Sequence, residues 1–120
     1  MKIGIIGLGA VGTANKEGFE FIGHTIVPHD INLDTSIQDV LNTEITFLCV
    51  PTPQAEDGSC DTSVLESVIK ELNRYSYKGI IAIRSTVVPG FTQRMIDTYR
   101  NLTICFVPEF LRERCAAEDF

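Results

Sequence analysis

Short apolar runs alternate along the chain with segments whose apolar residues recur at helical spacing. The runs predict strands at about 2–6, 25–30, 45–50, 80–84 and 103–107. The segments between them predict helices at about 11–21, 36–42, 63–74 and 90–100. Strands that alternate with helices are typical of a parallel sheet with helices on its faces, so the pattern predicts an α/β fold.

The helix at 63–74 has the clearest pattern. Its apolar stripe consists of Val64, Leu65, Val68, Ile69 and Leu72, with Thr62 or Ser63 as the N-cap and Glu66 near the start. We interpret this stripe as core and not as a binding face.

Two features predict how the strands are ordered. Pro28 has no N–H to donate to a neighbouring strand, so the second strand should lie at an edge. Only 14 residues separate Asp30 from Ile45, which leaves no room for another strand. Right-handed crossovers then give the order 2-1-3-4-5, with the switch point between the first and third strands and any ligand over their carboxyl ends.

The last predicted strand, 103–107, reads as buried on both faces, yet this order places it at the other edge of the sheet. Its outer backbone groups would then be a template for another chain. We therefore expect a homo-oligomer.

Length and charge limit the function. With 120 residues, 44% of them hydrophobic, the chain is expected to form one domain over 1–120. The net charge of −6 argues against nucleic acid and anionic membranes as partners. No secretory pattern and no membrane-spanning apolar run is present, so a soluble, cytoplasmic protein is expected.

The four cysteines show no CxxC spacing, and no metal site is expected. Cys49 and Cys105 lie inside apolar strand-like runs and are predicted to be buried free thiols. Cys60 and Cys115 fall in predicted loops, without a nearby His in the sequence to activate them.

A glycine motif follows the first strand directly. Gly7, Gly9 and Gly12 form a GxGxxG pattern between that strand and the first predicted helix. Gly7 would allow the sharp turn, Gly9 the approach of a pyrophosphate, and Gly12 close packing of the helix. The helix start attracts phosphate through its free amides and dipole. The motif favours a dinucleotide-binding, Rossmann-like, doubly wound sheet over a purely structural glycine turn.

Asp30 ends the second strand, 18 residues after Gly12, near the place where a carboxylate accepts hydrogen bonds from an adenosine ribose. No Lys or Arg follows within residues 31–34 to neutralise a 2′-phosphate, which favours NAD over NADP. The alternative is a solvated aspartate at the end of a strand.

Three further strands end in polar loops at the same edge of the predicted sheet. These loops are VPTP at 50–53, RSTVVPG at 84–90 and VPEFLRE at 107–113. Each alone is compatible with an ordinary strand-to-helix turn. Together beside the glycine motif they indicate a site, because they supply hydroxyl and carboxylate groups on one rim.

The motifs GLGAVG, VPTP with a downstream DGSCDTS, STVVPG and PEFLRE, in this order, resemble the amino-terminal NAD-binding domain of the UDP-glucose/GDP-mannose dehydrogenase family. The resemblance covers nearly the whole chain. It implies NAD as cofactor and a nucleotide sugar, most simply UDP-glucose, as substrate of a parent enzyme. Such an enzyme oxidises the C6 alcohol twice, to a carboxylate, through a covalent thioester.

The resemblance also implies roles for individual residues. Glu109 would be the acid/base of thioester hydrolysis, Thr86 would contact NAD near the nicotinamide, and Glu113 would lie near the cofactor. The implied cofactor-binding residues are Gly7, Gly9, Ala10, Val11, Gly12, Asp30, Val50, Pro51, Thr52, Ser85, Thr86 and Glu113, and the implied substrate-binding residues are Glu109, Phe110, Leu111, Arg112 and Glu113.

The chain departs from the family pattern in two places. The long insert that usually follows the ribose aspartate is absent, and Arg114 stands where the family favours a small residue. The catalytic Cys, Lys and Asn, the central helix and the nucleotide-sugar domain of the family are also missing from the 120 residues. We expect either the NAD-binding domain of a nucleotide-sugar 6-dehydrogenase or a non-catalytic nucleotide-binding or assembly module that keeps only the fold.

Overall fold

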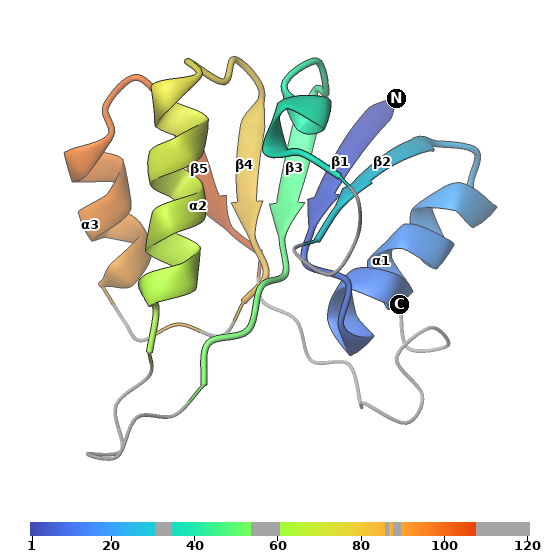
Figure 1. Ribbon diagram of the computed structural model, residues 1–120, viewed down its shortest axis with the longest axis horizontal. Helices are drawn as coiled ribbons and strands as arrows, with labels where there is room; N and C mark the ends of the chain where they lie inside the picture. Colours follow the sequence, from blue (N-terminus) through green and yellow to red (C-terminus); the bar gives the residue numbers. More distant parts are fainter. Residues whose placement is uncertain (31–34, 54–60, 86, 88–89, 108–120) are drawn as a thin grey trace.

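The computed structural model consists of five parallel strands in one sheet, with helices on both faces (Figure 1). It describes residues 1–30, 35–53, 61–85, 87 and 90–107. In chain order the elements are β1 (Lys2–Ile6), α1 (Ala10–Phe21), β2 (Thr25–His29), the 3-10 helix η1 (Ile37–Val40), β3 (Ile45–Leu48), α2 (Ser63–Arg74), β4 (Ile80–Ile83), α3 (Phe91–Thr98) and β5 (Thr103–Phe106). The strand order is β2-β1-β3-β4-β5, as the sequence predicts.

The register of the sheet brings the carboxyl ends of β1, β2 and β3 together. Ile6 at the end of β1 lies beside His29 of β2 and Leu48 of β3. Pro28 lies on β2, which pairs only with β1 among the described strands, so the predicted edge position is confirmed. The switch point therefore lies at β1 and β3, with the loop after β1 at its centre.

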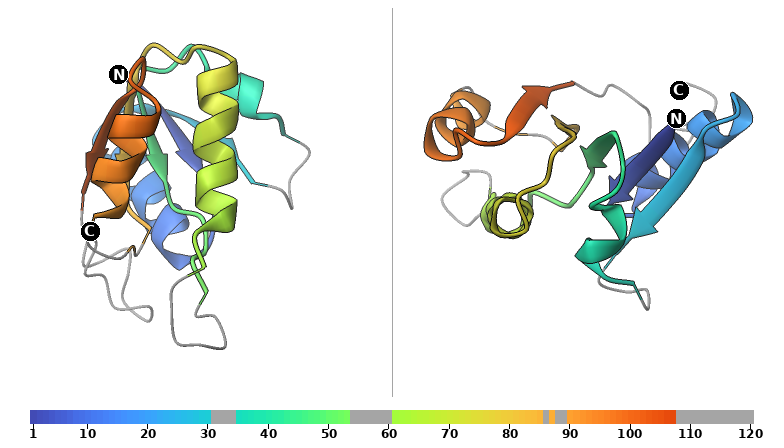
Figure 2. Two further views of the ribbon diagram at one scale, coloured as in Figure 1. Left: turned by 90° about the vertical axis from the view of Figure 1, so that its left-hand side faces the viewer. Right: turned by 90° about the horizontal axis from the view of Figure 1, so that it is seen from above.

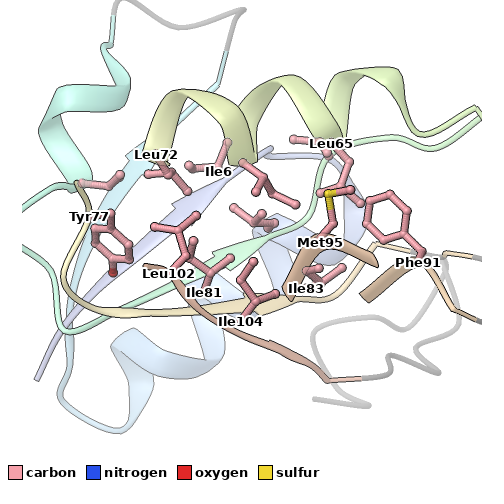
Figure 3. Close-up of a cluster of buried hydrophobic side chains, with 14 residues drawn as sticks. Ile6, Leu65, Leu72, Tyr77, Ile81, Ile83, Phe91, Met95, Leu102 and Ile104 are labelled. Carbon is pink, nitrogen blue, oxygen red and sulfur yellow. The ribbon is translucent and has the colours of Figure 1, made fainter. Parts of the chain in front are cut away.

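Alternate residues of each strand face opposite sides of the sheet and form two clusters. One side packs against α2 and α3, and Figure 3 shows Leu65, Leu72 and Met95 of these helices over the strand residues. On the other side, Phe19 of α1 stacks on Phe47 of β3 with 4.9 Å between ring centroids. The view from above in Figure 2 places α1 on one face and α2 with η1 on the other.

The helix predicted at 36–42 is shorter than expected. Only Ile37–Val40 is helical, as one 3-10 turn whose first residues are capped by Ser36 and Asp39. The Ser36 hydroxyl accepts from the Gln38 N–H, and the Asp39 carboxylate accepts from the Ser36 N–H. The Val40 carbonyl accepts from both the N–H and the hydroxyl of Thr43, so the chain turns toward β3 after this single helical turn.

One residue of the predicted stripe on α2 is exposed. Leu65, Ile69 and Leu72 are fully buried and Val68 is partly buried, whereas Val64 is 44% exposed. Successive residues of a helix are rotated by about 100°, so Val64 lies at the margin of the buried face, whereas Leu65 lies at its centre.

The prediction that β5 is buried on both faces is wrong. Ile104 is buried, but Thr103, Cys105 and Phe106 are exposed. As an edge strand, β5 has a neighbouring strand on one side only, and within the described residues no helix packs on the face opposite α3.

The cysteines accordingly differ from the prediction of buried thiols. Cys105 is an exposed free thiol, and Cys49 is half-buried at the end of β3. Cys60 and Cys115 lie outside the described residues. Among the residues that the structure describes, no helix has the length and apolar character needed to cross a membrane.

Candidate functional site

The turn after β1 lies between the ends of β2 and β3. Gly7 has a φ of +95°, a conformation that favours glycine, and its N–H donates to the His29 carbonyl at 2.8 Å. A Cβ at this position would lie 2.8 Å from the carbonyl carbon of Cys49. The predicted sharp turn at Gly7 is therefore confirmed, and the neighbouring backbone leaves no space for a side chain.

Gly12 is where α1 packs against this turn. A Cβ on Gly12 would lie 1.8 Å from the Gly7 carbonyl oxygen, well inside any allowed contact. The predicted role of Gly12 in close packing of the helix is thus confirmed.

Gly9 differs from both other glycines. Its φ of −76° is open to any residue, and no atom lies within 4 Å of the place where a Cβ would be. Neither the backbone conformation nor packing within the described residues requires a glycine here. The residue is exposed, so the space beside it is open to a ligand.

Gly9 is also the N-cap of α1. It supplies no side-chain cap, and no acidic residue stands in the first helical turn. The first amides of a helix have no partner within the helix, and the dipole adds positive potential at this end. An open surface over uncapped amides is the geometry that a pyrophosphate needs, so the turn fits the phosphates of a dinucleotide.

Asp30 follows β2 and reaches across to the same turn. Its Oδ2 accepts from the Leu8 N–H at 2.6 Å, and the residue is half-buried. The carboxylate consequently lies beside the glycine turn, at the carboxyl edge of the sheet. Its predicted contact with a ribose stays a prediction.

The ends of β3 and β4 are joined by a buried hydroxyl. Ser85 is 6% exposed, and its Oγ lies 2.7 Å from the Val50 carbonyl and 3.2 Å from that of Leu48. The hydroxyl therefore holds the β3 loop in place and faces backbone instead of solvent. In that loop Val50 is buried, Thr52 is half-buried and Pro51 is exposed.

Two hydroxyls of the site have no counterpart in the sequence prediction. Thr13 Oγ1 donates to the Leu8 carbonyl at 3.2 Å, so both polar backbone groups of Leu8 are bound by side chains. Thr35 Oγ1 lies 3.3 Å from both the N and the O of Asp30 and 2.8 Å from Nδ1 of His29. A single threonine belongs to no distinctive sequence motif. For Thr35, the only signal in the sequence is that it lies close to Asp30.

A positive charge stands near the same edge. The guanidinium of Arg84, which follows β4, lies 5.1 Å from the centroid of the Phe47 ring. Its backbone N–H donates to the Leu48 carbonyl at 2.9 Å. Within the described part of the chain, no group of three or more His, Cys, Asp or Glu is placed to hold a metal ion.

The other predicted site residues are not placed. Ala10 and Val11 belong to α1, but their side chains are not described. Thr86 and the stretch Glu109, Phe110, Leu111, Arg112 and Glu113 lie outside the described residues. The structure thus brings together Gly7, Gly9, Gly12 and Asp30, with the β3 loop next to them.

Comparison with known proteins gives a consistent set of relatives. The profile of the UDP-glucose/GDP-mannose dehydrogenase family, NAD binding domain, matches residues 31–120. UDP-glucose 6-dehydrogenase AglM of Haloferax volcanii is 29% identical, over all of this chain and 39% of the relative. UDP-glucose 6-dehydrogenase of Streptococcus pneumoniae is 31% identical, over 83% of this chain and 26% of the relative.

Comparison with solved structures leads to the same kind of protein. A UDP-glucose dehydrogenase from the hyperthermophilic archaeon Pyrobaculum islandicum superposes with a TM-score of 0.85 at 27% identity. That match covers 99% of this chain and 38% of the solved one. The chain therefore spans well under half the length of the relatives that it resembles.

Proposed function

The chain belongs to the UDP-glucose/GDP-mannose dehydrogenase family and represents its NAD binding domain, and we propose that the turn after β1 holds the pyrophosphate of that cofactor. The observation that carries the proposal is Gly9. Neither its backbone conformation nor its packing needs a glycine, yet a side chain there would fill the space beside the first amides of α1. The amides of Ala10 and Val11 are proposed as phosphate donors.

Asp30 is proposed to bind the adenosine ribose. Its carboxylate lies beside the turn, because Oδ2 is bound to the Leu8 N–H. Residues 31–34 contain no Lys or Arg that would offset a 2′-phosphate, so repulsion from Asp30 selects NAD against NADP. The β3 loop, Val50 to Thr52, is proposed to lie against the cofactor, and Ser85 supports that loop from below.

The activity proposed for a protein that contains this domain is oxidation of a nucleotide sugar. The named relatives are UDP-glucose 6-dehydrogenases, which makes UDP-glucose the proposed substrate. The glycine turn and Asp30 would hold NAD, which supplies a hydride acceptor, and the two oxidations of C6 would consume two NAD molecules, one for each hydride. Thr86 is proposed to lie near the nicotinamide, Phe110 to Glu113 to hold the sugar, and Glu109 to accept a proton from the water that hydrolyses the thioester.

The experiment that tests the cofactor site is calorimetric titration of the chain with NAD and NADP. We expect NAD to bind and NADP to bind more weakly. Asp30→Ala removes hydrogen bonds to a charged acceptor, worth about 1.5–3 kcal/mol, so NAD affinity is expected to fall about 10- to 100-fold.

A matched control is Asp97→Ala, which removes the same charge from the exposed surface of α3. This variant is expected to bind NAD like the unmodified chain. Equal affinity for NAD and NADP, or equal losses in the two variants, would contradict the assignment of Asp30.

A further inference from the structure

We propose that the Thr35 hydroxyl is a positioning group for Asp30: it fixes the backbone of residue 30 and thereby directs the carboxylate toward the ribose of NAD. The inference rests on the proposed function of Asp30 and deepens it. Thr35 itself would touch no atom of the cofactor.

The contacts of Thr35 converge on one residue and its neighbour. Thr35 Oγ1 lies 3.3 Å from the Asp30 nitrogen, 3.3 Å from the Asp30 carbonyl oxygen and 2.8 Å from Nδ1 of His29. A hydroxyl has two lone pairs and one proton. It can therefore accept from the Asp30 N–H and give its proton either to the Asp30 carbonyl or to the ring of His29.

The position of Asp30 explains why such an anchor matters. The paired register of β2 with β1 ends at His29, whose carbonyl accepts from the Gly7 N–H. Residue 30 comes after the last rung of this ladder, at an edge of the sheet. Thr35 supplies hydrogen bonds to the backbone of Asp30 at the point where the strand stops providing them.

The carboxylate is then fixed from two directions. Leu8 holds Oδ2 through its N–H, and Thr35 holds the backbone that carries the side chain. A ligand that meets a group already in its binding geometry does not lose affinity to the entropy of ordering it.

The experiment compares NAD affinity, by calorimetry, in three variants of the chain. Thr35→Val keeps the shape and removes the hydroxyl, and we expect affinity to fall about 3- to 10-fold. Thr35→Ser keeps the hydroxyl and is expected to restore affinity close to that of the unmodified chain. Thr98→Val is the matched control, because the Thr98 hydroxyl lies on the exposed surface of α3 and donates to the Arg94 carbonyl of the same helix.

A double-mutant cycle separates positioning from a general effect on the fold. If Thr35 acts through Asp30, adding Thr35→Val to Asp30→Ala causes no further loss of NAD affinity. Circular dichroism and thermal melting show whether each variant is folded, and Thr35→Ala replaces Thr35→Val if the valine variant is not.

The outcomes distinguish this inference from the function on which it rests. Absence of NAD binding by the unmodified chain would overturn the proposed function itself. Binding that depends on Asp30 but not on Thr35, failure of serine to restore it, or additive losses in the cycle would overturn only the role of Thr35.

Discussion

At the level of single residues, two glycines of the GxGxxG motif have opposite surroundings. Gly9 has an ordinary backbone conformation and open space beside it, whereas a Cβ on Gly12 would overlap the Gly7 carbonyl. We expect Gly9→Val to leave the domain folded and to abolish NAD binding, because the side chain fills the pyrophosphate space. Gly12→Val should instead destabilise the fold by at least about 1–3 kcal/mol through overpacking.

Urea unfolding followed by circular dichroism, together with an NAD titration, checks both expectations. Each variant serves as the control of the other, since both place the same side chain in the same glycine motif. Unfolding of Gly9→Val, or unchanged NAD binding by that variant, would count against a ligand at Gly9.

Sequence spacing predicts the part of the site that depends on backbone. The positions of Gly7, Gly12 and Asp30 relative to the first strand are enough to place them at one turn, as the structure does. Sequence spacing does not predict the roles of Thr13 and Thr35, because these depend on which hydroxyl lies within hydrogen-bonding distance of a given carbonyl or amide. Ser85 has the residue type of a ligand contact, but its hydroxyl is buried against backbone.

At the level of elements, α2 shows how one helical face is divided between core and surface. Leu65 is fully buried, and its neighbour Val64 is 44% exposed. We expect Leu65→Ala to lower the free energy of unfolding by about 2–5 kcal/mol. Val64→Ala should change it by no more than about 0.5 kcal/mol, since alanine also has the higher helix propensity.

Urea denaturation of the two variants measures this difference directly. Equal losses of stability would mean that Val64 is as buried in solution as Leu65, and would restore the stripe that the sequence predicts.

The start of α2 is linked to α3 by charge. The Thr62 hydroxyl donates to Oε2 of Glu66 at 2.8 Å and lowers the pKa of that carboxyl, which also pairs with Arg94 at 3.2 Å. The sequence predicts Thr62 or Ser63 as the N-cap, and the structure places Thr62 there, but its hydroxyl binds Glu66 instead of capping a backbone N–H. At a pH above the usual pKa of a glutamate, the ionised Glu66 stabilises the folded state by linking α2 to α3. This stabilisation is lost as the pH falls through the lowered pKa of Glu66.

The bounds of the strands follow from the apolar pattern of the sequence. All five strands are predicted within two residues of their observed ends, since apolar runs of this length between polar loops have few other solutions. The burial of β5 and the length of η1 are not predicted. Both depend on what packs beside the element, and neither the apolar pattern nor the spacing of residues contains that information.

At the level of the whole molecule, the two edges of the sheet differ. β2 has Pro28, which opposes pairing with a further strand on the outer edge of β2. β5 exposes Thr103, Cys105 and Phe106 and has no proline within its bounds. We propose self-association through β5 and expect the chain to dimerise at high concentration. Cys105→Lys should shift the chain toward monomer, because lysine on an edge strand opposes pairing with a second copy.

Sedimentation equilibrium under reducing conditions tests this proposal. Cys105→Ser is the control that removes the thiol without adding charge, and it should associate like the unmodified chain. A monomeric unmodified chain at high concentration, or equal association of the lysine variant, would exclude β5 as the interface.

The central position of β1 determines when the sheet can close during synthesis. Of the described strands β1 comes first in the chain but lies between β2 and β3, so the sheet cannot close around it until β3 has been made. After His29 ends β2, nineteen more residues are added before Leu48 completes β3, which takes about 1–4 s of translation at 5–20 residues per second. Throughout that interval the nascent chain presents the backbone edge of β1 that β3 covers in the finished sheet, so this edge is open to other partners only while the chain is being made.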